Sequence, residues 1–398
     1  MNSPKPCPGT HTHSDETLVF RPRVVAMHNR LYPTREAALT ARTGPLDLRL
    51  CPQSGLVYNA LFDSSLVEYD PTYDSTVPSG ASVQYCRELA SFLNEKFGIA
   101  EGLVVEAGCG KGEFLHLLCE MFPRVRCLGM DPSCVPEKNT DPRIQLIQDI
   151  YREEQVTEQP ALVMCRHAMD QMDDPLGFIR SVAALCKRYP DCGIFIELRD
   201  MAEMVRTGSF WDFCFENHCY FTAQSLEQLL RIAGFKVTAS ARGLGGQYLW
   251  VGGVLETSSA EVAPPNLDAL RETMRAYGRN EADGIQGIRT TLATLRQKGS
   301  ATAVWGMSTK GVNYVTNVDL DASLITHCID INSRRHHTFL PVTAHEVEGP
   351  DALLKTLGQP LAVIIMNPAY VAEIRQTCHD MGLRPDFYDA RMNLLPTG

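Results

Sequence analysis

The chain has no apolar run of about 18 residues, which is the least that a membrane-spanning helix needs. Residues 1–13 are polar, with proline and histidine, and contain no apolar core of a secretory signal. There is also no excess of positive charge, because 37 Lys and Arg oppose 47 Asp and Glu for a net charge of −10. We therefore expect a cytoplasmic protein that binds neither membranes nor nucleic acid over a general surface.

The cysteines do not follow the pattern of a disulfide framework. All 14 are scattered singly through apolar segments, which favours small core residues of a reduced protein. The chain has 398 residues, of which 44% are apolar. That length is too great for one ordinary core, so we expect two or three domains.

The most informative segment is a glycine-rich turn between an apolar run and a helical pattern. The apolar run starts at Leu103 and ends at Glu106, and the amphipathic stretch covers Phe114 to Met121. The glycines between them are Gly108, Gly110 and Gly112. This order predicts a buried strand, a tight turn and a helix start. Glycines allow close approach of a ligand, and a helix N-terminus offers free N–H groups.

A second apolar run, Val125 to Met130, ends in Asp131, where a carboxylate can accept hydrogen bonds from a ribose diol. A third, Ile144 to Ile147, precedes Asp149 and Ile150, which we expect beside an adenine. The spacing Glu-x-Gly-x-Gly-x-Gly differs from the dinucleotide form and resembles the first motif of class I S-adenosylmethionine (SAM) methyltransferases. The alternative is a structural turn with no ligand.

Turn-rich and periodic segments divide the chain into three expected parts. Residues 1–75, rich in proline and tyrosine, form a small N-terminal lobe. Residues 76–256 alternate strand and helix patterns around the glycine turn and close with a hairpin. After a linker over 257–266, residues 267–398 repeat the alternation. We therefore predict an α/β protein with a central Rossmann-like sheet, an N-terminal lobe and a second, C-terminal Rossmann-like domain.

The first turn of the last part, Gly306 to Gly311, lacks the middle glycine of a nucleotide loop. This favours a scaffold or a substrate-facing role there over a second cofactor.

Many motifs in this order resemble the three-domain class I SAM-dependent C-methyltransferases of nucleotide-linked deoxysugars in bacterial secondary metabolism. The resemblance covers nearly the whole chain. The matching segments are Leu48 to Asn59 in the lobe; Val105 to Leu115, Gly129 to Ser133, Cys165 to His167 and Glu216 to Phe221 in the middle; and Val304 to Gly306, Ile329 to Asn332 and Met366 to Tyr370 in the last part. It implies methyl transfer to a small-molecule acceptor, most like C-methylation of a nucleotide-linked ketosugar.

The first departure from this family lies in the zinc-binding lobe. The family has two Cys-x-x-Cys pairs, but here Thr10 and Ser54 stand where the second thiolates belong, so only Cys7 and Cys51 remain. A structural zinc ion needs four ligands, and we expect the lobe to fold without metal. The alternative ligand set adds His11 and His13 to the two cysteines.

The second departure lies in the catalytic loop. Asn217 occupies the place of a family histidine that would remove a carbon-bound proton, and Gln171 occupies that of another. His218 could be the base, with Glu216 orienting it and Tyr220 near the developing oxyanion. His167, expected at the carboxyl edge of the sheet, is the other candidate. Their alternatives are an exposed loop histidine and a histidine that packs under the cofactor.

The expected cofactor residues are Glu106, Gly108, Cys109, Gly110, Gly112, Asp131, Asp149, Ile150 and Tyr73. Asp149 has the alternative role of a helix N-cap and Tyr73 that of core packing. Two other functions stay open. One is an O- or N-methyltransferase, which the missing histidines favour because an amine needs little help from a base. The other is a non-catalytic SAM-binding relative.

Overall fold

The computed structural model describes residues 4–16, 23–26, 30–67, 69–70, 80–256 and 262–396. The chain forms two compact units. The first contains residues 1–18, 47–204 and 217–272, and the second contains residues 19–46, 205–216 and 273–398. The expected linker lies partly outside the described residues, and the three-part division of the chain stays a prediction.

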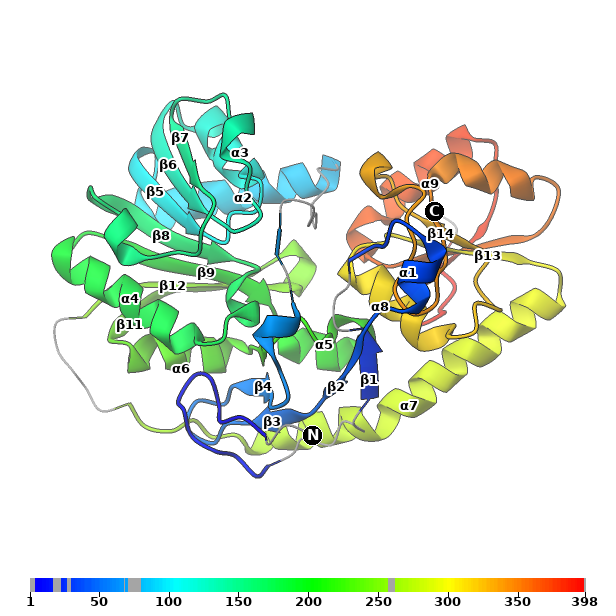
Figure 1. The fold of residues 1–398 in the computed structure, drawn as a ribbon, viewed down its shortest axis with the longest axis horizontal. Coiled ribbons are helices and arrows are strands. Elements are labelled where there is room, and N and C mark those ends of the chain that lie inside the picture. The colour runs from blue at the N-terminus through cyan, green and yellow to red at the C-terminus, as the bar shows by residue number, and fades with distance from the viewer. Residues whose placement is uncertain are drawn as a thin grey trace. The chain divides into compact units, whose positions relative to one another are not determined.

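The first unit is built on a seven-stranded sheet with the order β11-β12-β9-β8-β5-β6-β7 (Figure 1). Its parallel strands are β5 (Glu101–Ala107), β6 (Arg124–Met130), β7 (Ile144–Ile147), β8 (Pro160–Arg166) and β9 (Gly193–Arg199). The hairpin of β11 (Phe235–Gly243) and β12 (Tyr248–Leu255) adds antiparallel strands to β9. The predicted sheet closed by a hairpin is confirmed.

Helices cover both faces of this sheet, as Figure 1 shows. The helices are α2 (Gly80–Phe97) and α3 (Glu113–Met121) on one face, and α4 (Pro175–Arg188) and α6 (Ala223–Ile232) on the other. Buried side chains alternate along β5, with Val104 in the core under α2 and α3 and Val105 in the opposite core. Helix α6 ends just before Gly234, whose φ of 92° favours glycine.

A small antiparallel sheet completes the first unit. It has the order β10-β4-β3, with β3 at Leu48–Leu50, β4 at Val57–Asn59 and β10 at Cys219–Tyr220. Tyr220 pairs with Val57, so the backbone two residues after Asn217 is held in this sheet.

The second unit has a parallel sheet with the order β15-β14-β13-β16-β17. Its strands are β13 (Ala301–Trp305), β14 (His327–Ile329), β15 (Val347–Glu348), β16 (Leu361–Ile365) and β17 (Asp386–Asp389). Its helices are α1 (Arg35–Leu39), α8 (Thr309–Val318), α9 (Val371–Asp380) and most of α7 (Asp268–Gln297), and β1 (Arg23–Ala26) pairs with β2 (Thr43–Leu46). Helix α5 (Met201–Thr207) begins in the part of the chain assigned to the first unit and ends in residues 205–216 of the second. The predicted second Rossmann-like sheet is confirmed.

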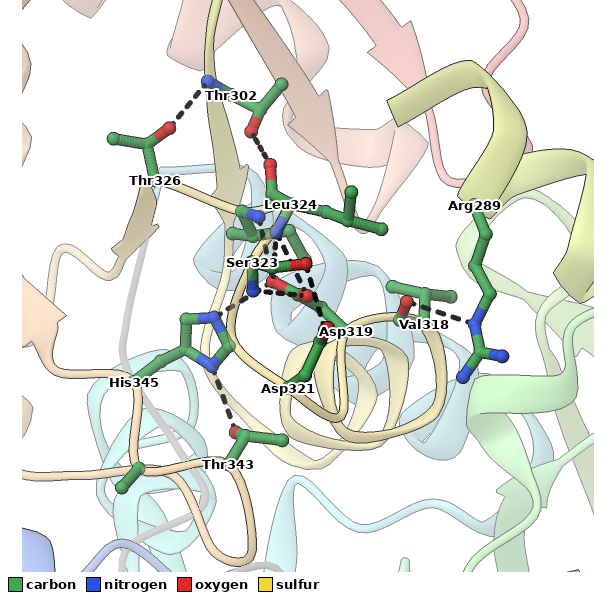
Figure 2. Close-up of polar contacts among 12 residues, drawn as sticks. Arg289, Thr302, Val318, Asp319, Asp321, Ser323, Leu324, Thr326, Thr343 and His345 are labelled. Atoms are coloured by element: carbon green, nitrogen blue, oxygen red, sulfur yellow. Dashed lines mark hydrogen bonds and ion pairs between the residues drawn. The ribbon is translucent and has the colours of Figure 1, made fainter. Parts of the chain in front are cut away.

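Strand β14 is preceded by a loop in which a buried carboxylate holds the backbone of residues 323–325. Figure 2 shows Asp319, directly after α8, accepting hydrogen bonds from the backbone N–H groups of Ser323 and Leu324 at 2.8–3.0 Å. The N–H of Ile325 donates to the same carboxylate at 2.8 Å, and Nε2 of His345 lies 3.1 Å away. Strand β14 therefore begins only at His327.

The turn after β13 is held by a side chain that follows the neighbouring strand β14. Asp330, after β14, accepts a hydrogen bond from the backbone N–H of Met307 at 2.8 Å and pairs with Arg335 at 2.9 Å.

Among the described residues, no helix is both long and apolar enough to cross a membrane.

Candidate active site

Two neighbouring parallel strands, β5 and β8, mark the point where the strand order of the first sheet reverses. From β5 the chain continues outward to β6 and β7, and from β8 it continues outward on the other side to β9. Ligands of open α/β sheets bind outside the carboxyl ends of the strands at such a point. Gly108 follows β5 and His167 follows β8, so the glycine turn and this histidine lie at the same edge.

The turn between β5 and α3 has a backbone that favours glycine. The φ angles of Gly108, Gly110 and Gly112 are 76°, 56° and 85°. A Cβ on Gly108 would lie 2.3 Å from the Cβ of Ala168, whereas a Cβ on Gly110 would meet nothing within 4 Å among the described residues. Gly108 is therefore packed against the turn after β8, and Gly110 faces open space. Helix α3 begins with no side-chain cap, which leaves its first N–H groups available to a ligand.

Glu106 provides a buried acceptor at this edge. It is 2% exposed, and its Oε2 atom has no hydrogen-bond partner among the described residues. Burial raises the pKa of this carboxyl to about 7, while Arg166, whose Nη1 lies 3.6 Å from Oε1, acts in the opposite direction. A buried carboxylate oxygen without a partner fits a cationic group of a ligand, such as the methionine ammonium of SAM.

Asp131 lies at the end of β6 and ties the glycine turn to it. Its Oδ2 accepts a hydrogen bond from the N–H of Gly110 at 2.9 Å, and its Oδ1 accepts one from Ser133 at 2.7 Å. Each carboxylate oxygen keeps further lone-pair capacity, which suits a ribose diol. The residues at this edge therefore fit SAM at both its methionine and its ribose ends.

The remaining predicted cofactor residues lie around the same edge where the structure describes them. Asp149 accepts a hydrogen bond from the N–H of Ile150 at 2.8 Å and lies 3.3 Å from Arg152, while the Ile150 side chain is 57% exposed. Cys109 is buried, and burial raises the pKa of its thiol. Tyr73 lies outside the described residues.

His167 is held at the carboxyl edge by strand β9. Its backbone N–H donates to the carbonyl of Glu197 at 2.9 Å, and its Nε2 lies 3.3 Å from Oε2 of the same residue. Its φ of 53° is uncommon for a residue with a Cβ. The ring packs against Tyr248 at 4.5 Å between centroids, and its side chain is 38% exposed, so it can reach a ligand at this edge.

His218 has a different environment. It is 3% exposed, its ring stacks on Phe62 at 4.5 Å, and its Nδ1 donates to the carbonyl of Met172 at 3.0 Å. Burial lowers the pKa of this imidazole to about 4. Its Nε2 has no partner among the described residues. The ring is therefore neutral near pH 7 and packed in the interior of the first unit.

The other two predicted catalytic residues belong to different units. Tyr220 is buried in β10, in the first unit, and Glu216 is buried in the second unit. His218 directly precedes β10, the strand of the small sheet that contains Tyr220. His167 instead lies with the cofactor residues.

The two cysteines of the N-terminal lobe face each other without a metal-ligand set. The Cys7 thiol lowers the pKa of the Cys51 thiol to about 4, and Cys51, together with burial, raises that of Cys7. The hydroxyl of Thr10 lies 3.1 Å from Sγ of Cys51. His11 lies 3.9 Å from Asp174. Within the described residues, no group of three or more His, Cys, Asp and Glu side chains could hold a metal ion.

Sequence reasoning missed the buried partners of this edge. They are Arg166, Glu197, Tyr85 and Trp250. The available signal was a charged residue, Glu197, within the apolar run of β9. A buried acid in a central strand requires a partner, but the sequence does not say which.

The doubly wound sheet, the glycine turn and the two carboxylates define a class I SAM-dependent methyltransferase domain. Comparison with known families agrees: a methyltransferase domain matches residues 80–240, and a C-methyltransferase C-terminal domain matches residues 267–384. The chain is therefore a SAM-dependent methyltransferase that carries the C-terminal domain found in C-methyltransferases.

Among curated proteins, the C-methyltransferase NovU of Streptomyces niveus is 26% identical over 294 residues, which are 69% of each chain. Among solved structures, CalO1, a methyltransferase in calicheamicin biosynthesis, is 15% identical over 44% of this chain and 55% of its own, with a TM-score of 0.36. Human N-acetylserotonin methyltransferase is 16% identical over 44% and 56%, with a TM-score of 0.33.

Proposed function

We propose that the protein transfers a methyl group from SAM to a carbon atom of a nucleotide-linked ketosugar, a small molecule of secondary metabolism. The observation that carries the proposal is the common position of Glu106 and His167 at one sheet edge, because a cofactor anchor and a base are what this reaction needs. The matched C-terminal domain and the relative named a C-methyltransferase support the same reaction.

SAM, when bound, supplies an electrophilic methyl group. In this proposal Glu106 holds the methionine ammonium and Asp131 the ribose diol, and the glycine turn lets the backbone approach closely. His167 removes the proton from the carbon beside the ketone. That carbon then bonds to the methyl group as the sulfur–methyl bond breaks, so the net products are the methylated ketone, S-adenosylhomocysteine and one proton.

The remaining predicted residues have supporting roles in this proposal. Cys109, Asp149, Ile150 and Tyr73 belong to the cofactor site, and Glu216, His218 and Tyr220 to the acceptor side. The low pKa of His218 and its burial favour His167 as the base.

One feature favours a different acceptor atom. Asn217 and Gln171 are amides at positions where the family that this chain resembles has histidines, and an amine acceptor needs little help from a base. An O- or N-methyltransferase on another small molecule is therefore the second candidate. Exchange of the acceptor α-proton into solvent separates the two reactions, because only C-methylation requires that proton to leave.

The first test is calorimetric titration with S-adenosylhomocysteine of the wild type and of Asp131→Ala. We expect binding that weakens about tenfold or more in the variant, since a charged acceptor of hydrogen bonds contributes about 1.5–3 kcal/mol. Product formation is then screened with ketosugar, hydroxyl and amine acceptors. A folded wild type that binds no S-adenosylhomocysteine would refute the proposal.

We also propose a cytoplasmic location, supported by the state of the cysteines. All 14 are free thiols, and most are buried. Labelling of the protein in cells by a thiol reagent after unfolding, with and without prior reduction, measures this. Full labelling without reduction is the expected result.

A further inference from the structure

Glu197, on β9, is a buried carboxylate on which four side chains converge. The indole N–H of Trp250 donates to its Oε1 at 3.0 Å, and the hydroxyl of Tyr85 donates to the same oxygen. Arg166 Nε donates to Oε2 at 2.7 Å, and Nε2 of His167 lies 3.3 Å from that oxygen. The proposed reaction assigns Glu197 no role, yet the most exposed of these four described partners is the histidine at the cofactor edge.

We propose that Glu197 is a positioning residue that orients the imidazole of His167 and increases its basicity. The kinetic part of this inference rests on the proposed function, whereas the structural part does not. A histidine whose one ring nitrogen faces a buried carboxylate presents the other nitrogen outward, and the carboxylate stabilises the protonated ring.

The backbone supports this orientation. The carbonyl of Glu197 accepts a hydrogen bond from the N–H of His167 at 2.9 Å, so the same residue holds both the main chain and the ring. The φ of 53° at His167 points to a turn that is fixed by its surroundings. Tyr248 packs against the ring, and Ala168, the next residue, abuts Gly108 of the cofactor turn.

Two neighbouring groups, the Trp250 N–H and the Arg166 guanidinium, favour the ionised form of Glu197 and so oppose the effect of burial. Burial raises the pKa of Glu197 to about 8, and the Trp250 N–H acts in the opposite direction. The guanidinium of Arg166 at 2.7 Å also favours the carboxylate, and it is fixed because it lies 3.9 Å above the ring of Phe114. The titratable and charged groups that face the pair are Arg166 from β8, Tyr85 from α2, Tyr248 from β12 and, beyond Arg166, Glu106 from β5.

The test compares Glu197→Gln with Glu158→Gln. Glu158 is an exposed acid just before the start of β8, at the opposite edge of the sheet, where it pairs with Arg126. In protein with isotope-labelled histidine, His167→Gln identifies the His167 signal, and an NMR titration gives its pKa. We expect the pKa of His167 to fall by about one unit or more in Glu197→Gln, since an opposite charge at this distance has an effect of that size. The Glu158→Gln protein should match the wild type.

The kinetic readout is exchange of the acceptor α-proton. In Glu197→Gln we expect an exchange rate about 100-fold lower, with its acidic pH limb moved to lower pH by the same shift as the His167 pKa. The KM of the acceptor and the affinity for S-adenosylhomocysteine should stay within about twofold, because Glu197 contacts neither in this proposal. A lost binding of S-adenosylhomocysteine together with an unchanged His167 pKa would instead mean a structural role and would overturn the inference.

Tyr85→Phe keeps the inference testable if Glu197→Gln does not fold. It removes one donor to Oε1 and retains the ring, so the carboxylate is less favoured and the pKa of His167 should fall by a smaller amount. An unchanged His167 pKa in a folded variant of either kind overturns the proposal. If the wild type methylates no carbon acceptor, the proposed function fails, while the NMR titration still decides the role of Glu197.

Discussion

Replacing Gly110 by alanine separates a ligand-binding turn from a merely structural one. Gly110 has a φ of 56°, and a Cβ there would meet nothing within 4 Å among the described residues. The folded protein therefore has room for the methyl group, and the cost to stability is limited to the left-handed backbone. If SAM occupies the space that Gly110 faces, the same methyl group collides with it.

The expected losses of stability and of affinity follow from two costs, that of the left-handed backbone and that of the collision with the ligand. An alanine in the left-handed region costs about 1–2 kcal/mol, and for a unit of this size each kcal/mol lowers the Tm by about 2–4 °C. Displacing the ligand or the turn adds an overpacking cost of about 1–3 kcal/mol that applies only to the complex. We therefore expect binding of S-adenosylhomocysteine to weaken about 5- to 150-fold. Calorimetry measures the affinity, and a thermal melt without ligand measures the stability.

Gly98 provides the matched control. It follows α2 at the other end of the sheet, has a φ of 65°, and a Cβ there also meets nothing within 4 Å of the described residues. Gly98→Ala carries the same backbone cost, so it should lower the Tm similarly and leave the affinity within about twofold of the wild type. If Gly110→Ala bound S-adenosylhomocysteine as tightly as Gly98→Ala, the turn would not hold the cofactor.

Further predictions concern three buried ionisable groups. Because the pKa of Glu106 is raised to about 7, the folded protein holds this proton up to that pH, and its stability falls as pH rises from about 4.5 to 7. The affinity for S-adenosylhomocysteine should increase from about pH 6 to 8, as Glu106 becomes charged. In calorimetry, Glu106→Gln should abolish the pH dependence of this affinity. Asp319→Ala leaves the backbone N–H groups of Ser323, Leu324 and the buried Ile325 without this acceptor and should destabilise the second unit by about 3 kcal/mol in urea unfolding, with Asp319→Asn less affected. The native Asp319 carboxylate, whose pKa is lowered to about 2, contributes stability that is lost only as pH falls from about 3.8 through 2. His218 should stay neutral in an NMR titration down to about pH 4, and a midpoint near its ordinary value would mean that the ring reaches solvent.

Most of the first sheet could be predicted because each strand is a short apolar run with its own boundary. The runs that end at Glu106 and Asp131 carry their function at the strand end, so local pattern and ligand chemistry point to the same place. The helix over Ala223–Ile232 was predictable for a similar reason, since a glycine marks its end. These signals depend only on residues that are neighbours in the sequence, so tertiary contacts do not change what they predict.

What could not be predicted depends on residues far apart in the chain. Residues 19–46 and 205–216 belong to the second unit, and no periodicity in either segment indicates this. The short strand β14 depends on Asp319, whose carboxylate replaces strand hydrogen bonds for the residues before it. Glu197 lies within an apolar run of the sequence, and its partner becomes visible only when β8 and β9 place Arg166 opposite it.

The two amides in the catalytic pattern change meaning once the histidines are placed. From the sequence, Asn217 and Gln171 suggest that a base is missing and that His218 replaces it. In the structure His218 is neutral, buried and stacked on Phe62, which are properties of a core residue. His167 instead combines exposure, a carboxylate partner and a place beside the cofactor turn. Loss of a histidine at position 217 is therefore compatible with proton removal, provided that the base acts from the end of β8.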